Sequence, residues 1–316
     1  MQSPIETTVV VGAGAVGSFF GAMLARAGHR VRFVGRPAYV DAVRADGLEL
    51  HMHGKVARIP VDATTQLDAV RDASLVLFAV KSTDTESVAR ALAPMLAPGA
   101  MVLDLQNGIE NADILKRHIA QWVVPAAVYV AVAMPRPGVI VHHGRGDLVV
   151  GPLRAADQRD TALARRLRDV AALFEASGVA VRVSPDVRGA LWNKLLVNCA
   201  VNAISAISQL PYGRMAEATE IRELQRAVVR EVIEVARADG QEIDAQEADA
   251  ALERIVVAMA EQLSSTAQDL ARGKPTEIDD LNGYIVRRGS ALGVPTPANQ
   301  SLYALVKLLE SVVARP

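Results

Sequence analysis

A glycine-rich turn near the N-terminus constrains the fold of this chain more than any other feature. The segment 7–17 reads TTVVVGAGAVG, in which a predicted buried strand runs into a turn and then into a helix over residues 15–28. Gly12, Gly14 and Gly17 have the G-x-G-x-x-G spacing, which suits a tight turn, close approach of a pyrophosphate, and close packing of the helix on the strand. Between a strand and a helix, this motif favours a dinucleotide site over a glycine-rich turn that binds nothing.

The start of this helix would supply the contacts to the phosphates. Backbone N–H groups at a helix N-terminus attract anions, and the helix dipole adds to the attraction. The predicted cofactor-binding residues of the turn are therefore Gly12, Ala13, Gly14, Ala15, Val16 and Gly17.

The end of the second predicted strand, HRVRFVGR, bears on which dinucleotide binds. Sites for NAD place an acidic residue there, about 20 residues after the turn, to hold the ribose 2′-hydroxyl. Here the strand ends in Val34-Gly35-Arg36, and the next acid is Asp41. The Arg36 guanidinium suits a 2′-phosphate, so we predict NADPH. The alternative is a solvated surface arginine, and Arg32 is a weaker second candidate.

The rest of the first half alternates strand-like and helical segments. Apolar strands such as SLVLFAVK and MVLDLQNG, separated by a helix over 85–96, indicate an α/β N-terminal domain with a Rossmann-type, doubly wound parallel sheet. The segment 125–153, rich in valine and glycine, predicts additional antiparallel strands. After Pro185 we predict helices over 188–208, 216–239, 245–271, 277–292 and 297–314. We therefore expect a dinucleotide-binding domain over 1–183 and an all-α substrate and catalytic domain over 184–316.

Composition and charge exclude several classes of partner. The chain has 34 Lys and Arg against 35 Asp and Glu, which argues against binding to nucleic acid or to an anionic membrane. The apolar run 123–134 is too short to cross a bilayer. His142 and His143 have no third ligand at useful spacing, so no metal site is predicted, and the single Cys199 permits no intrachain disulfide. We expect a cytoplasmic protein that acts on a small molecule, and allow for a homodimer because nothing in the sequence decides the oligomeric state.

Two polar residues follow predicted strands at the edge where ligands bind in an open α/β sheet. Lys81 follows SLVLFAV, and Asn107 follows MVLDLQ. Lys81 could reach a carboxylate or a ribose, and Asn107 could bond the nicotinamide ribose or a substrate oxygen. The alternatives are a solvated lysine and an asparagine that only begins a turn.

A polar stripe interrupts an otherwise apolar predicted helix. The segment 192–205 reads WNKLLVNCAVNAIS and spaces Lys194, Asn198 and Asn202 at i, i+4 and i+8, which places them on one face. Buried polar groups need partners, so this face predicts a cleft at the domain boundary that binds a small polar ligand. The alternative is a lysine that reaches solvent and amides that satisfy backbone carbonyls.

Motifs along nearly the whole chain resemble, in order, those of the ketopantoate reductase (2-dehydropantoate 2-reductase) family. They are GAGAVG, AVKS at Lys81, LQNG at Asn107, WNKLLVNCAVNAISAI at Lys194, and SSTAQDLARGKPTEIDDLNG around Ser265 and Glu277. The resemblance implies an NADPH-dependent reduction of 2-dehydropantoate to (R)-pantoate, a step toward pantothenate and coenzyme A. It defines the type of reaction better than the substrate, because some family members reduce other 2-oxo acids.

The resemblance also implies roles for individual residues. Lys194 corresponds to the general acid, which would stabilise the growing negative charge on the carbonyl oxygen and protonate it. Glu277, the second implied catalytic residue, corresponds to a substrate-site glutamate that pairs with Lys194 or bonds the substrate hydroxyl. The substrate site would further contain Asn107, Asn198, Asn202 and Ser265, with Lys81 and Asn107 lying between cofactor and substrate. Asp279 and Asp280, in the same motif as Glu277, are predicted to form a solvated helix start.

Alternative functions stay open at this point. Tyr212 stands where some family members have asparagine, which weakens the implication of pantoate as the product. A reductase of another branched 2-oxo acid would use the same lysine. A non-catalytic NADPH-binding regulator would need only the glycine turn and Arg36, so Lys194 and Glu277 argue against it. An NAD-dependent 3-hydroxyacid dehydrogenase would have an acid at the end of the second strand.

Overall fold

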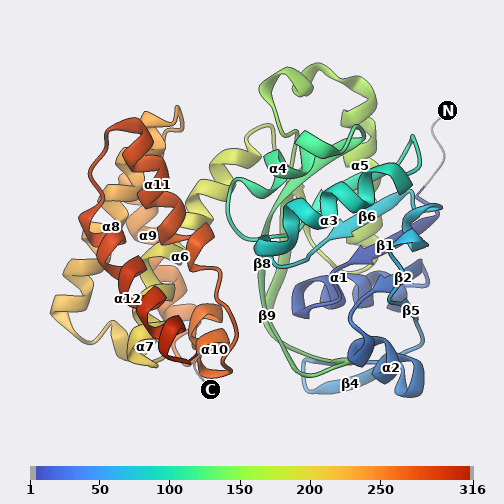
Figure 1. Cartoon of the computed structure of the whole chain (residues 1–316), viewed down its shortest axis with the longest axis horizontal. Coiled ribbons are helices and arrows are strands. Elements are labelled where there is room, and N and C mark those ends of the chain that lie inside the picture. Colours follow the sequence, from blue (N-terminus) through green and yellow to red (C-terminus); the bar gives the residue numbers. More distant parts are fainter. Residues whose placement is uncertain (1–4, 314–316) are drawn as a thin grey trace. The chain divides into compact units, whose positions relative to one another are not determined.

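The computed structural model describes residues 5–313, and its ribbon is drawn in Figure 1. The chain divides into two compact units. The first contains the residues up to Gln106 together with Glu110–Val187, and the second contains Asn107–Ile109 and the residues from Arg188 onward. The segment Asn107–Ile109 therefore groups with the helical unit, although the chain on both sides of it belongs to the first unit.

A ten-stranded sheet forms the frame of the first unit (Figure 1). Along the chain its strands are β1 (Thr7–Val11), β2 (Arg30–Val34), β3 (Leu48–Met52), β4 (Lys55–Ile59), β5 (Asp62–Thr64), β6 (Leu75–Phe78), β7 (Met101–Asp104), β8 (Trp122–Arg136), β9 (Val139–Val150) and β10 (Val181–Val183). The order in the sheet is β4-β3-β9-β8-β7-β6-β1-β2-β5, with β10 paired to β9. All pairs from β8 to β5 are parallel, which confirms the predicted Rossmann-type sheet.

Two antiparallel hairpins extend this parallel sheet. Strands β8 and β9 pair antiparallel, as the valine- and glycine-rich segment predicts. Strands β3 and β4 form the second hairpin, and β3 pairs in parallel with β9. Sequence analysis missed this hairpin, although its turn residues His53 and Gly54 have φ of 52° and 71°. Positive φ at both central residues is the geometry of a tight hairpin turn, for which Gly54 was the available signal.

Helices cover both faces of the sheet: α1 (Ala15–Arg26), α2 (Pro37–Asp46), α3 (Thr85–Leu92), α4 (Asn111–His118) and α5 (Thr161–Ala176). On one face, alternate strand residues such as Val10 and Leu77 share a core with α1, α2 and α5. On the other face, Val9 and Val76 share a core with α3 and α4. Strands buried on both faces read as continuous apolar runs, which explains why SLVLF and TTVVV were recognisable.

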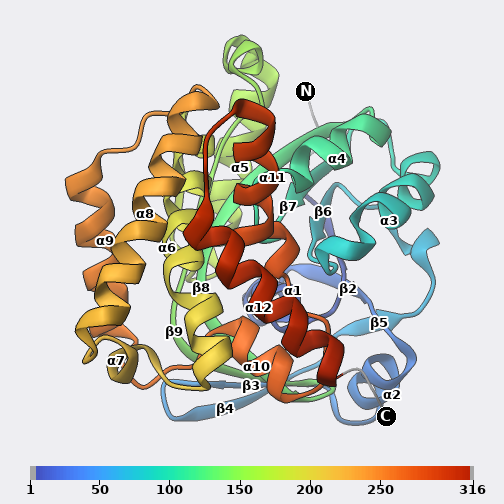
Figure 2. The same ribbon diagram turned by 60° about the vertical axis from the view of Figure 1, so that its left-hand side comes forward.

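The described part of the second unit is built from helices (Figure 2). They are α6 (Val187–Ser208), α7 (Tyr212–Met215), α8 (Thr219–Ala238), α9 (Ala245–Ala258), α10 (Ser265–Ala271), the 3₁₀ turn η5 (Ile278–Asp280), α11 (Asn282–Leu292) and α12 (Pro297–Val313). Helices α8, α11 and α12 pack against one another. The predicted all-α second half is confirmed.

The prediction of one helix over 245–271 is wrong. Helix α9 ends at Ala258, and α10 begins at Ser265. Ser264 is the N-cap of α10, and its Oγ accepts a hydrogen bond from the Ala267 N–H at 3.0 Å. A capping serine satisfies an N–H group that lacks an intrahelical partner, so it marks the start of a new helix inside a continuous helical pattern.

Helix α6 carries the polar stripe and is otherwise apolar. Among the described residues it is the one helix long and apolar enough to cross a membrane by length and composition. In the structure, however, 72% of its apolar window is buried inside the protein, and Trp192 is completely buried. Its hydrophobic character is thus that of a core helix.

Candidate active site

The three glycines of the motif, two in the turn after β1 and Gly17 in the first turn of α1, are needed for different structural reasons. Gly12 has φ +98°, and a Cβ there would lie 2.5 Å from the backbone of Ala79 and Val80. A Cβ on Gly17 would lie 2.5 Å from the Gly12 carbonyl oxygen. At Gly14, by contrast, nothing lies within 4 Å of the Cβ position. The fold requires Gly12 and Gly17, whereas the open space at Gly14 fits a pyrophosphate.

The start of α1 can receive an anion. Gly14 is its N-cap and makes no side-chain cap, and the first turn contains no acidic residue. The first intrahelical bond runs from the Ser18 N–H to the Gly14 carbonyl at 2.9 Å, so the N–H groups of Ala15, Val16 and Gly17 precede it. Such N–H groups lack intrahelical partners and can bind phosphate oxygens. The Ala13 N–H instead donates to the Val34 carbonyl at 3.2 Å and ties the turn to β2.

Two arginines near β2 differ in their availability to a ligand. Arg32 is held by Asp62 at 2.9 Å, by Asp72 at 3.2 Å and by the Ala69 carbonyl at 3.0 Å. Arg36 is the N-cap of α2, its side chain is exposed, and it makes no side-chain hydrogen bond within residues 5–313. Arg36 is therefore the better placed of the two to bind a ligand phosphate.

Lys81 lies at the carboxyl end of β6 in the first unit, and its side chain is exposed. The neighbouring strand ends are ordered by Gln106, which sequence analysis did not single out. The Gln106 Nε2 donates to the Val80 carbonyl at 2.9 Å and to Thr85 Oγ1 at 2.8 Å, and its N–H donates to Asp104 Oδ1 at 3.0 Å. Gln106 directly precedes Asn107, so these bonds fix the point where the chain enters the second unit.

Asn107, Lys194 and Glu277 meet in the second unit. The Lys194 Nζ donates to Asn107 Oδ1 at 2.8 Å, and Asn107 Nδ2 donates to Glu277 Oε2 at 2.8 Å. All three side chains are half-buried. The asparagine amide thus connects a cation at its acceptor end with a carboxylate at its donor end, and these two charges determine its orientation.

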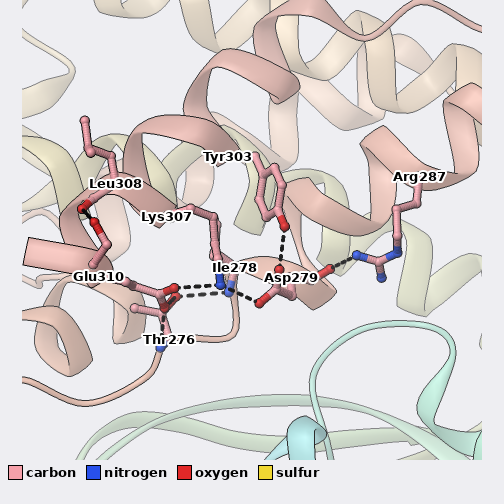
Figure 3. Close-up of polar contacts among 9 residues, drawn as sticks. Thr276, Ile278, Asp279, Arg287, Tyr303, Lys307, Leu308 and Glu310 are labelled. Carbon is pink, nitrogen blue, oxygen red and sulfur yellow. Dashed lines mark hydrogen bonds and ion pairs between the residues drawn. The ribbon is translucent and has the colours of Figure 1, made fainter. Parts of the chain in front are cut away.

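A network of polar contacts braces the segment that carries Glu277 (Figure 3). On one side of Glu277, the Thr276 N–H and Oγ1 donate to Glu310 Oε1 at 2.8 and 2.7 Å. On the other side, Asp279 accepts from the Tyr303 hydroxyl at 2.6 Å and from Lys307 Nζ at 2.9 Å. Lys307 also pairs with Glu310 at 2.8 Å, so α12 holds both ends of the segment.

This network corrects the prediction that Asp279 forms only a solvated helix start. Burial alone would raise the pKa of Asp279, but the hydrogen bonds from Tyr303 and Lys307 outweigh it and lower the pKa. Burial would also raise the pKa of Glu310, but the hydrogen bonds from Lys307 and Thr276 outweigh it, so the pKa of Glu310 is lowered as well. The spacing of Tyr303, Lys307 and Glu310 along one helix face was a signal that could have indicated such partners.

The remaining predicted substrate residues lie on or near α6 in the second unit. Asn198 is half-buried and has no hydrogen-bond partner within residues 5–313, whereas the Asn202 side chain accepts from Tyr212. Ser265, the first residue of α10, is exposed and also makes no side-chain hydrogen bond in that range. The structure therefore connects Lys194, Asn107 and Glu277 directly and leaves Asn198 and Ser265 with free polar groups.

The arrangement suits the reduction of a carbonyl. Negative charge grows on the carbonyl oxygen when hydride adds to the carbon, and a lysine can both stabilise that charge and protonate the oxygen. Among the described residues, no group of three or more His, Cys, Asp or Glu side chains could hold a metal ion. The ionisable groups at hand for this chemistry are the lysine and the carboxylate that Asn107 connects.

The fold, the glycine turn and the helical unit are those of two-domain, nicotinamide-dependent oxidoreductases. Residues 8–155 match the family model described as ketopantoate reductase PanE/ApbA, and residues 186–310 match its C-terminal model. The chain belongs to the ketopantoate reductase family.

Individual relatives agree with this assignment. The chain is 33% identical to a 2-dehydropantoate 2-reductase of Halobacterium salinarum, with 96% of this chain and 98% of the relative covered. It is 50% identical in sequence to a PanE/ApbA family ketopantoate reductase from Ralstonia eutropha JMP134. The crystal structure of that protein matches with a TM-score of 0.89 over 97% of this chain and 99% of that chain. A D-mandelate dehydrogenase solved with NADH and anilino(oxo)acetate has a TM-score of 0.90 over 97% of this chain and 99% of that chain, but at 24% identity it shows the fold alone.

Proposed function

We propose that this protein reduces the ketone of 2-dehydropantoate to the alcohol of (R)-pantoate with NADPH, a step toward pantothenate and coenzyme A. The observation that carries the proposal is the pair of 2.8 Å hydrogen bonds joining Lys194, Asn107 and Glu277. These residues lie in the family's own sequence motifs, and relatives such as that of Halobacterium salinarum are named 2-dehydropantoate 2-reductase.

Each residue of the candidate site has a separate role in the proposed reduction. NADPH, held by the glycine turn and Arg36, would supply the hydride for the ketone carbon. Lys194 donates a proton from Nζ to the carbonyl oxygen as the charge grows there, and the resulting amine regains a proton from solvent. Asn107 holds Nζ in place through Oδ1, and Glu277 orients Asn107 from the other side. Asn198 and Ser265 offer free polar groups to the oxygens of the substrate.

The preference for NADPH over NADH rests on Arg36. Its guanidinium is exposed and unpaired in the described chain, and no acid lies at the end of β2 to hold a free ribose 2′-hydroxyl. A 2′-phosphate would form a charge-assisted hydrogen bond with this guanidinium, which NADH cannot do. We also place the enzyme in the cytoplasm, where its lone, buried Cys199 would remain a thiol.

Steady-state oxidation of NADPH, measured with 2-dehydropantoate and a panel of other 2-oxo acids, tests the proposal. We expect the highest kcat/KM for 2-dehydropantoate, and a lower value with NADH. A higher kcat/KM for another branched 2-oxo acid would support the proposed reaction type but show that 2-dehydropantoate is not the preferred substrate. Absence of turnover with every 2-oxo acid, in protein that binds NADPH, would refute the enzymatic function.

A further inference from the structure

A buried hydroxyl adjoins the polar stripe of α6. Tyr212, the first residue of α7, is 6% exposed, and its hydroxyl donates to Asn202 Oδ1 at 3.2 Å. Asn202 is 4% exposed. Burial raises the pKa of Tyr212 far above its ordinary value, so the phenol stays protonated and remains a hydrogen-bond donor.

Other hydrogen bonds hold both partners in place. The Tyr212 N–H donates to the Gln262 carbonyl at 3.1 Å. The Ser264 Oγ donates to the Asn202 carbonyl at 3.1 Å, and the Ser264 N–H donates to Ser205 Oγ at 3.2 Å. The segment 262–264 therefore ties the backbone of Tyr212 to that of Asn202. With both backbones held, the bond from the tyrosine hydroxyl holds the Asn202 amide in the orientation in which Oδ1 faces Tyr212.

The orientation of this amide decides what it can offer a ligand. An asparagine side chain accepts hydrogen bonds at Oδ1 and donates them from Nδ2. Because Oδ1 faces the Tyr212 hydroxyl, Nδ2 is the end of the Asn202 amide that is left for a ligand, and it has no partner within residues 5–313. In a flipped amide, Nδ2 would donate to the tyrosine oxygen instead, and Oδ1 rather than the donor would be left for a ligand.

We propose that Tyr212 is a positioning residue that makes Asn202 a hydrogen-bond donor toward an acceptor oxygen of the substrate. The inference rests on the proposed function, which brings a 2-oxo acid to the stripe of Lys194, Asn198 and Asn202. The carboxylate and the ketone of such an acid present only acceptor oxygens, so a donor at Asn202 suits them and an exposed Oδ1 would repel them. Tyr212 thereby contributes to selectivity for an anionic keto acid.

A double-mutant cycle on the keto-acid KM tests this role. Tyr212→Phe keeps the ring and removes the hydroxyl, so we expect the KM for 2-dehydropantoate to rise about 3- to 10-fold while kcat changes less than about two-fold. Asn202→Ala removes the donor itself. Adding Tyr212→Phe to Asn202→Ala should then raise KM no further, because the hydroxyl acts only through that amide.

Asn198→Ala is the matched control background, since Asn198 lies on the same stripe and makes no hydrogen bond with Tyr212. There the effect of Tyr212→Phe should persist in full. An unchanged KM in Tyr212→Phe, or an equal rise in the Asn202→Ala background, would overturn the inference.

A second variant keeps the inference testable where Tyr212→Phe unfolds. Asn202→Asp retains an acceptor for the Tyr212 hydroxyl but cannot donate, so KM should rise more than in Asn202→Ala, and a smaller rise would count against the inference. Failure of the proposed function is distinguishable, because it would appear as absent turnover in the unsubstituted protein.

Discussion

Gly14 offers a test of the dinucleotide site that separates binding from folding. Gly14 has φ −81° and ψ −170°, a conformation open to alanine, and nothing lies within 4 Å of its Cβ position. Alanine is a poorer N-cap than glycine by about 0.5–1 kcal/mol, and it stabilises by about 0.4–1 kcal/mol by restricting the unfolded chain. The two effects nearly offset each other, so Gly14→Ala should shift Tm by less than about 3 °C.

Cofactor binding should respond quite differently to Gly14→Ala. The added methyl group would occupy the open space assigned to the pyrophosphate and displace it from the N–H groups of Ala15 and Val16. Loss of one hydrogen bond to a charged group costs about 1.5–3 kcal/mol, which corresponds to a rise of roughly 10- to 150-fold in the Kd for NADPH. Fluorescence titration with NADPH and thermal unfolding of the same preparation measure both quantities.

Gly12→Ala is the matched control. A Cβ there meets backbone atoms at 2.5 Å, and φ is +98°, so strain and overpacking together should destabilise the fold by about 2–5 kcal/mol. A well-folded Gly14→Ala variant that bound NADPH with the unsubstituted Kd would refute the placement of a phosphate at Gly14. Equal losses of Tm in the two variants would refute the claim that a side chain at Gly14 has open space in the folded protein.

Other substitutions test the remaining parts of the site. Lys194→Ala should lower kcat by roughly 10²–10⁴-fold with an unchanged Kd for NADPH, and near-normal turnover would mean that Lys194 is not the general acid. Arg36→Ala should weaken NADPH binding by about 1.5–3 kcal/mol and leave NADH binding almost unaffected, whereas equal losses would remove Arg36 as the reader of the 2′-phosphate. Asp279→Asn should destabilise the protein at pH 7 by less than about 1 kcal/mol, because Asp279 and Lys307 are partly exposed. The folded-state pKa of Asp279 is lowered, so the difference in Tm from the unsubstituted protein should shrink as pH falls below the unfolded value of 3.8, and a constant difference would contradict the ionic role.

Local sequence patterns were enough to predict the strands, turns and helices that depend mainly on neighbouring residues. The run TTVVV and the glycines after it encode a strand, a turn and a helix within 20 residues of chain, and the structure contains β1 and α1 there. The helical period was enough to predict that Lys194, Asn198 and Asn202 share one face of a helix, and all three residues lie on α6. The His53–Gly54 turn and the break before Ser264 also had local signals, but no strands were predicted around the turn, and residues 245–271 were predicted as one continuous helix.

The contacts that assemble the candidate site depend on tertiary structure. Asn107 bonds Lys194 across 87 positions of sequence and Glu277 across 170, and no periodicity relates residues so far apart. The family resemblance named these residues, yet neither it nor the spacing indicated that Asn107 would join the other two. The bond between Tyr212 and Asn202 likewise depends on how the segment 262–264 packs against α6. Sequence determines which groups a helix or strand presents, because that follows from local backbone geometry, but which groups meet depends on how distant elements pack.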